Sequence, residues 1–330
     1  MKLSDQRITK EGVIVIKAQE HRSQEQNREE ALQRLQDLIK SAICASLSRY
    51  PNPVNPANRL VVLKESVWIV KLSEVRLRRC EEKLRMSEWY RKDLAYIHDV
   101  GFRSYVLQAM PEILAILKQH GIQDGLIVDL GCGSGLSAEE LVRTGYQVLG
   151  VDISADMIEI ARCRVPLAKF QVGSLFKVEI PDCNAVISIS ECFNYLFDPD
   201  HQTLTQVFQR IYDALAPGGV FIFDIAEPGQ LTSATPVKSF TEGEDWIVLV
   251  EKQEDLDRHI LTRRIITFRQ VGNDYRRDDE VHRQQLYVAA EIATMLQQVG
   301  YQVEIQRCYG QFALPNAHAA LIARKSMSNP

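Results

Sequence analysis

Residues 126–135 read Leu126-Ile127-Val128-Asp129-Leu130-Gly131-Cys132-Gly133-Ser134-Gly135. The apolar run at the start of this stretch is typical of a buried strand, and a helical pattern from Ser137 to Thr144 follows the glycines. Glycines suit such a loop because a side chain would hold a ligand away from the backbone. Strand, glycine loop and helix in this order predict a site for a nucleotide-type cofactor.

Two acidic residues indicate which kind of cofactor the loop binds. Asp129 precedes the glycines, and Asp152 follows it by 23 residues, close to the roughly 20 expected for a carboxylate that binds ribose. The glycine spacing is G-x-G-x-G, whereas dinucleotide sites have G-x-G-x-x-G. Asp129 would repel a pyrophosphate and attract an ammonium group. The pattern favours a cationic cofactor without phosphate over a structural glycine turn with acids that face solvent.

On these residues the chain resembles the class I S-adenosylmethionine-dependent methyltransferases, whose first motif is an acidic residue followed by G-x-G-x-G. The resemblance covers about residues 86–325 and includes Leu215-Ala216-Pro217-Gly218-Gly219, which is similar to the family's L-x-P-G-G turn. It implies that S-adenosylmethionine is the cofactor and that a methyl group passes to an acceptor by in-line displacement. We expect a small-molecule acceptor because no RNA-binding module is appended, but the sequence does not identify it.

The patterns in residues 86–330 predict an α/β fold with a Rossmann-like, doubly wound, mostly parallel sheet. The expected strands are Ile127–Leu130, Gln147–Val151, Lys169–Val172, Ala185–Ser190 and Val220–Ile225. The expected helices between them are Ser137–Thr144, Ala155–Arg164 and Gln202–Leu215, with a turn at residues 217–219. A helix at Val288–Gln298 and strands at Tyr301–Arg307 and Ala319–Arg324 predict the reversed C-terminal hairpin of the resembled family.

Residues 240–287 have a different pattern. The segments Trp246–Lys252 and Ile260–Phe268 are β-rich and alternate in part between apolar and polar residues, and Gly272-Asn273 predicts a turn before Tyr275. Alternation of this kind indicates antiparallel strands. We therefore expect an antiparallel β insertion that forms a lid in front of the site.

The resemblance implies a set of cofactor-binding residues. Asp129, Gly131 and Gly133 are expected at the methionine end, and Asp152 at the ribose hydroxyls. Ile153 and Leu175 are expected to sandwich the adenine, where Ser174 replaces the family's usual acid and accepts hydrogen bonds more weakly; a merely structural role is equally open for Ser174. The remaining expected residues complete the loop or follow the fourth strand: Cys132, as a small filler, Gly135 and Ser190.

The acceptor side offers three catalytic candidates. Tyr96 and His98 lie in a helical segment where the resembled family has a flap, and either could orient or deprotonate an acceptor. A packed aromatic face with a capped histidine is the alternative. His282, beside Glu280 and Arg283, could also face the site, or it could lie at a solvated strand end with paired charges.

A second resemblance concerns residues 8–45, which are similar to the catalytic domain of stalled-ribosome rescue hydrolases, relatives of bacterial release factors. The chain contains no Gly-Gly-Gln, the loop with which that family cleaves peptidyl-tRNA. We interpret residues 1–46 as a small helical and β fragment of that domain, with a helix from Gln24 to Ala45, followed by a linker of uncertain structure at 47–85 and the methyltransferase-like region at 86–330. A bifunctional or vestigial ribosome-rescue protein and a non-catalytic S-adenosylmethionine-binding protein remain alternatives.

The composition is consistent with a cytoplasmic enzyme. The seven cysteines form no C-x-x-C and have no histidine at zinc spacing, so we expect reduced thiols and no bound metal. No apolar run approaches the ~18 residues of a membrane span, and the N-terminus does not have the pattern of a signal peptide. The net charge of −4 and the mixed charges of residues 20–40 do not predict binding to nucleic acid or the ribosome.

Overall fold

The computed structural model describes residues 89–197, 203–232, 235–272 and 274–327, together with the backbone of three short strands nearer the N-terminus. These strands, β1 (Ile14–Ile16), β2 (Leu60–Leu63) and β3 (Trp68–Lys71), form a sheet in the order β1-β2-β3. The chain separates into two compact units, Met1–Arg85 and Met86–Pro330. Apart from β1, the release-factor-like segment 8–45 and its predicted helix lie outside the described residues. None of the described helices is long and apolar enough to cross a membrane.

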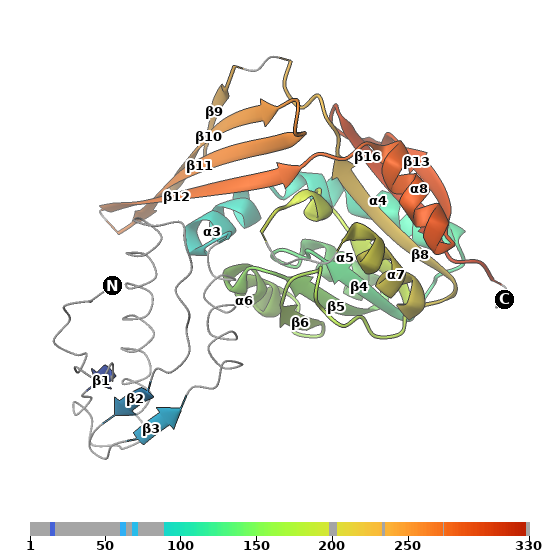
Figure 1. Cartoon of the computed structure of the whole chain (residues 1–330), viewed down its shortest axis with the longest axis horizontal. Coiled ribbons are helices and arrows are strands. Elements are labelled where there is room, and N and C mark those ends of the chain that lie inside the picture. Colours follow the sequence, from blue (N-terminus) through green and yellow to red (C-terminus); the bar gives the residue numbers. More distant parts are fainter. Residues whose placement is uncertain are drawn as a thin grey trace. The chain divides into compact units, whose positions relative to one another are not determined.

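A seven-stranded sheet forms the centre of the second unit (Figure 1). Its strands, in the spatial order β13-β16-β8-β7-β4-β5-β6, are β13 (Gln302–Gln306), β16 (His318–Arg324), β8 (Leu215–Ala226), β7 (Cys183–Ser188), β4 (Leu126–Leu130), β5 (Gln147–Asp152) and β6 (Lys169–Val172). Strands β4 to β8 pair in parallel, whereas β16 runs antiparallel to β8 and β13. The predicted mostly parallel sheet with a reversed C-terminal hairpin is confirmed.

Apolar side chains cover both faces of this sheet. On one face α4 (Ser104–Gln119) and α5 (Leu136–Thr144) contribute buried residues such as Ile113 and Leu141. On the other face α7 (Leu204–Ala214) and α8 (Ala289–Val299) contribute Phe208 and Leu296. The helix α6 (Ala155–Arg164) begins where the Ser154 hydroxyl accepts a hydrogen bond from the Met157 N–H. Helices on both faces confirm the doubly wound arrangement.

Two strand boundaries differ from the expectation for physical reasons. The turn predicted at residues 217–219 lies inside β8, which begins at Leu215. The chain is irregular at this point: Gly218 has a φ of +79°, and the pairing of β8 with β7 shifts its register. Strand β7 ends at Ser188, earlier than expected, because Ser190 and Glu191 have φ values of +70° and +57°. Two consecutive non-glycine residues in the left-handed region do not fit the extended backbone of a strand.

The predicted antiparallel insertion is a four-stranded sheet in the order β12-β11-β10-β9. Its strands are β9 (Val237–Glu242), β10 (Trp246–Asp255), β11 (Ile260–Val271) and β12 (Asp274–Gln285). Figure 1 shows this sheet beside α3 (Lys92–Gly101), and the buried Trp246 packs with Leu94 and Ile97 of that helix. The shorter elements are η1 (Cys192–Asn194), β14 (Cys308–Tyr309) and β15 (Phe312–Ala313).

Candidate cofactor and acceptor site

A cavity of about 520 Å³ lies at the carboxyl ends of the parallel strands. Its floor includes the glycine loop after β4 and the residues that follow β5, β6 and β7. Its other walls come from α3 and from β9, β10 and β11 of the antiparallel sheet, which contribute Thr241, Val250 and Ile265 among others. Parallel α/β sheets bind ligands at this edge.

The glycine loop gives the cavity a backbone surface. Gly131 and Gly133 line it, with φ values of +82° and +52°. A Cβ added at Gly133 would meet nothing within 4 Å, so a side chain there would occupy ligand space. Gly135 does not line the cavity; its φ is +80°, it precedes α5, and an added Cβ would meet Ala161 at 3.0 Å. Glycine is needed at position 135 because a side chain there would press against α6.

Two carboxylates, the buried Asp129 and the partly buried Asp152, face this loop without a cationic partner. Asp129 is 1% exposed and accepts a hydrogen bond from the Ser137 hydroxyl. The pKa of Asp129 is raised to about 7, chiefly by burial and to a smaller extent by the charge of Asp152, while the hydrogen bond from Ser137 opposes the shift. Asp152 accepts hydrogen bonds of 2.8 Å from the N–H groups of Gly133 and Ser154, and burial raises its pKa as well.

In the described part of the chain no lysine, arginine or histidine forms an ion pair with either carboxylate. Unpaired buried carboxylates are costly unless a cation joins them. Residues 129, 133 and 152 therefore fit a ligand that carries positive charge and approaches the backbone closely.

The other predicted cofactor residues also reach the cavity: Cys132, Ile153, Ser174, Leu175 and Ser190. The Ser174 hydroxyl accepts a hydrogen bond from the Phe176 N–H at 3.2 Å, which leaves its own proton for a ligand. Burial raises the pKa of the Cys132 thiol well above its usual range, so this cysteine is a filler rather than a nucleophile.

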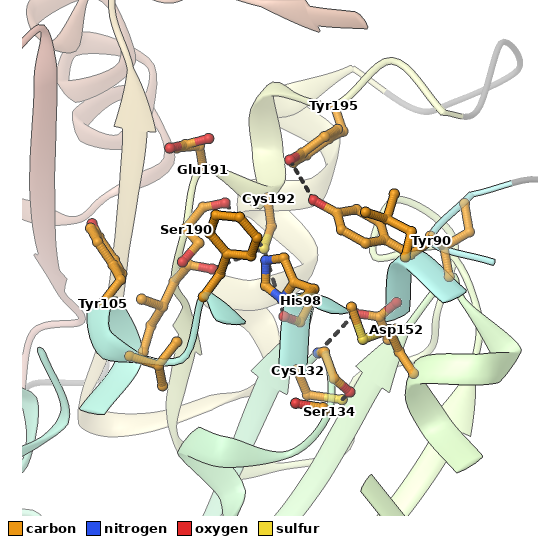
Figure 2. A pocket seen from close by; sticks show the side chains of 18 of the residues that line it. Tyr90, His98, Tyr105, Cys132, Ser134, Asp152, Ser190, Glu191, Cys192 and Tyr195 are labelled. Carbon is orange, nitrogen blue, oxygen red and sulfur yellow. Dashed lines mark hydrogen bonds between the residues drawn. The ribbon is translucent and has the colours of Figure 1, made fainter. Parts of the chain in front are cut away.

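Only one of the three predicted catalytic residues lines the cavity. His98 points inward from α3 (Figure 2), and burial lowers its pKa to about 4, so the imidazole is neutral at pH 7. Tyr96 does not line the cavity: its hydroxyl lies 3.3 Å from Asp245, and the Arg269 guanidinium lies over its ring. His282 is fully buried beside Glu280, with an Nε2–Oε2 distance of 2.8 Å, and does not line the cavity either.

A strained loop after β7 positions Glu191 at the cavity wall. The Asp224 carboxylate accepts hydrogen bonds from the N–H groups of Ser190 and Glu191, at 3.1 and 2.6 Å. It also accepts from the hydroxyls of Tyr105 and Tyr309, at 3.1 and 3.0 Å. Four donors on one carboxylate hold the two left-handed residues in place.

The sequence did not predict that four polar side chains, Glu191, Arg263, Tyr90 and Tyr195, line the same part of the cavity. Glu191 Oε2 lies 3.2 Å from Arg263 Nη2, and the Tyr90 and Tyr195 hydroxyls are 2.9 Å apart (Figure 2). Glu191 and Tyr195 follow the fourth strand, which was a usable signal. No sequence signal pointed to Arg263, because alternation along a strand does not tell which face of the strand is buried.

Comparison with known proteins agrees with this architecture. Residues 127–219 match the family model described as a methyltransferase domain. A protein of Geobacillus sp. named as a methyltransferase is 29% identical over 195 residues, which are 57% of this chain and 78% of that protein. The trans-aconitate 2-methyltransferase of Rhizobium meliloti is 38% identical over 97 residues, 29% of this chain and 36% of that protein.

Solved structures share the fold. An S-adenosylmethionine-dependent methyltransferase from Clostridium acetobutylicum has a TM-score of 0.61 at 21% identity, covering 70% of this chain and 97% of that one. DesVI of Streptomyces venezuelae has a TM-score of 0.61 at 18% identity, covering 72% and 100%. The family match and the shared fold support a class I methyltransferase domain that includes residues 127–219, with S-adenosylmethionine as its cofactor.

Proposed function

We propose that this chain transfers a methyl group from S-adenosylmethionine to a small-molecule acceptor bound between the glycine loop and the antiparallel sheet. One observation carries the proposal: a single cavity runs from Gly133 to Thr241 and Val250 on the antiparallel sheet, which leaves space for an acceptor beyond the cofactor loop. When bound, S-adenosylmethionine supplies a methyl group activated by its sulfonium, for in-line displacement by the acceptor.

The chain's own residues bind and orient the two molecules. Asp129 and Asp152 favour a cationic cofactor, because Asp129 is buried, Asp152 is partly buried, and neither carboxylate has a cationic partner in the described ranges. Gly133 allows the cofactor to approach the backbone, whereas Gly131 is needed because an added Cβ would collide with Cys192 Sγ. Ile153 and Leu175 supply apolar surface for an adenine ring. Holding both reactants in one cavity replaces a bimolecular encounter by a positioned one.

We assign proton acceptance from the acceptor to His98. Its imidazole lines the cavity, is neutral at pH 7, and forms no hydrogen bond with the described side chains. A neutral imidazole with a free nitrogen can take a proton from an acceptor N–H or O–H. We give Tyr96 and His282 no contact with the acceptor, since neither lines the cavity.

Calorimetry and label transfer test the proposal. The full-length protein is expected to bind S-adenosylmethionine and not NAD, and to move a labelled methyl group into one component of a metabolite extract. If the cofactor binds but the label never leaves it, the chain is a non-catalytic cofactor-binding protein. Binding of NAD alone would overturn the cofactor assignment.

The role of His98 has a matched control. His98→Asn is expected to lower kcat by about 10²–10⁴-fold and to leave the Kd of the cofactor within a factor of two. His120→Asn, at the end of α4 and outside the cavity lining, should change neither value. Unchanged turnover in the His98 variant would remove the histidine from the mechanism.

A further inference from the structure

Two basic side chains line the acceptor side of the cavity from neighbouring strands. Lys252 on β10 and Arg263 on β11 are directly opposite partners in the antiparallel register, and both line the cavity. Like charges in opposite positions repel and destabilise a strand pair. Negative charge in the cavity beside Lys252 and Arg263 would offset this repulsion.

Glu191 supplies only part of that charge. Its carboxylate lies 3.2 Å from Arg263 Nη2 and also accepts a hydrogen bond of 2.9 Å from Gln284. A nitrogen of the His318 ring lies 2.9 Å from the other carboxylate oxygen. Although burial opposes ionisation, Arg263, His318 and Gln284 together hold the pKa of Glu191 well below its usual range. Glu191 is therefore ionised and its charge is matched by Arg263.

The Glu191–Arg263 ion pair leaves N–H donors without a partner on both Lys252 and Arg263. The Lys252 ammonium forms no hydrogen bond or ion pair with any residue that the structure describes. The pKa of Lys252 is lowered, first by burial and then by Arg263, while Glu191 opposes the shift. The Arg263 Nε–H is buried and has no hydrogen-bond partner among the described atoms. Among the charged side chains that line this side of the cavity, Lys252 and Arg263 are positive and Glu191 is negative, so with His98 neutral they carry one positive charge in excess.

We propose, on the basis of the methyl transfer proposed above, that the acceptor carries a carboxylate which binds the Lys252 ammonium beside the Glu191–Arg263 ion pair. One carboxylate balances the one uncompensated positive charge, whereas a phosphate dianion exceeds it. An ammonium is a strong donor to carboxylate oxygens. The adjoining wall is apolar, with Val248, Val250, Ile265 and Phe197, so the rest of the acceptor is an apolar body.

Binding of small probes tests this without knowledge of the true acceptor. The full-length protein, saturated with S-adenosylhomocysteine, is titrated with benzoate, hexanoate, their two primary amides and phenyl phosphate. Each acid is expected to bind at least tenfold more tightly than its amide and more tightly than phenyl phosphate. Lys252→Met should remove at least tenfold of the acid's affinity and leave the S-adenosylhomocysteine Kd within a factor of two.

A lysine elsewhere on the same sheet provides the control. Lys238 on β9 has a side chain 76% exposed, lies 3.1 Å from Glu251 and does not line the cavity. Lys238→Met should bind every probe as the unmodified protein does. Lys252→Gln serves as a second variant in case the Met variant fails to fold, which circular dichroism would reveal.

Several results would overturn the carboxylate site. They are equal binding of acid and amide, binding of none of the probes, tighter binding of phenyl phosphate, or unchanged acid binding in the Lys252 variants. Loss of S-adenosylhomocysteine affinity in Lys252→Met would place the lysine on the cofactor instead. If the unmodified protein does not bind S-adenosylhomocysteine, the proposed function fails, and titration of the unloaded protein then decides the carboxylate site by itself.

Discussion

At the scale of single residues, the cofactor side depends on two carboxylates with different surroundings. Asp152 accepts hydrogen bonds from two backbone N–H groups and keeps further acceptor capacity for ribose hydroxyls. Asp152→Ala is expected to weaken S-adenosylmethionine binding by about 2 kcal/mol, the usual loss for hydrogen bonds to a charged group. Calorimetry measures the Kd of S-adenosylmethionine for this variant. The control is Asp182→Ala, because Asp182 is an exposed acid outside the cavity. An unchanged Kd would remove Asp152 from the ribose site.

Asp129 makes cofactor binding dependent on pH. Its pKa of about 7 in the free protein means that the carboxyl is largely protonated below neutrality. A cationic cofactor favours the carboxylate, so binding releases a proton and the affinity is highest above pH 7. Between pH 7 and pH 5.5 the affinity should fall by up to about tenfold per unit. Calorimetric titrations in two buffers of different ionisation enthalpy would detect the proton that Asp129 releases on binding. An affinity that does not change with pH would contradict this role of Asp129.

At the scale of elements, the glycine loop is shaped for a ligand rather than for folding alone. Gly133→Ala and Gly121→Ala both place a Cβ at a positive φ, +52° and +81°, with nothing within 4 Å. Each should lower the free energy of unfolding by about 1 kcal/mol, the cost of a left-handed residue. Only Gly133→Ala should also weaken S-adenosylmethionine binding, by at least tenfold, because only Gly133 lines the cavity. Equal binding by both variants in calorimetry would show that the loop needs glycine only for its backbone.

At the scale of the whole molecule, the second unit contains a complete sheet and its covering helices. The two large apolar clusters on the faces of the seven-stranded sheet consist of residues between 105 and 323. We therefore expect residues 86–330 to fold and to bind S-adenosylmethionine without the first 85 residues. Circular dichroism and calorimetry of the shortened protein check this. A soluble fragment that no longer binds, or an insoluble one, would make residues 1–85 an integral part of the domain.

The sequence by itself determined the features that depend on neighbouring residues. The strand, glycine loop and helix at residues 126–144 follow one another, so their pattern predicts their structure. Asp152 could be placed beside this loop because parallel strands bring their carboxyl ends to one edge. The antiparallel insertion was predictable from its β-rich segments, their partial alternation and the turn at Gly272-Asn273.

The tertiary structure alone decided which side chains line the cavity. Glu191 and Arg263 are 72 residues apart and meet only because β11 lies against the loop after β7. His282 was a candidate by its chemistry, but its side chain is buried beside Glu280. Periodicity describes the few residues on either side of a position, and it identifies two faces of a strand without saying which one is covered. The packing of one sheet against another settles that choice, and with it the residues that line the cavity.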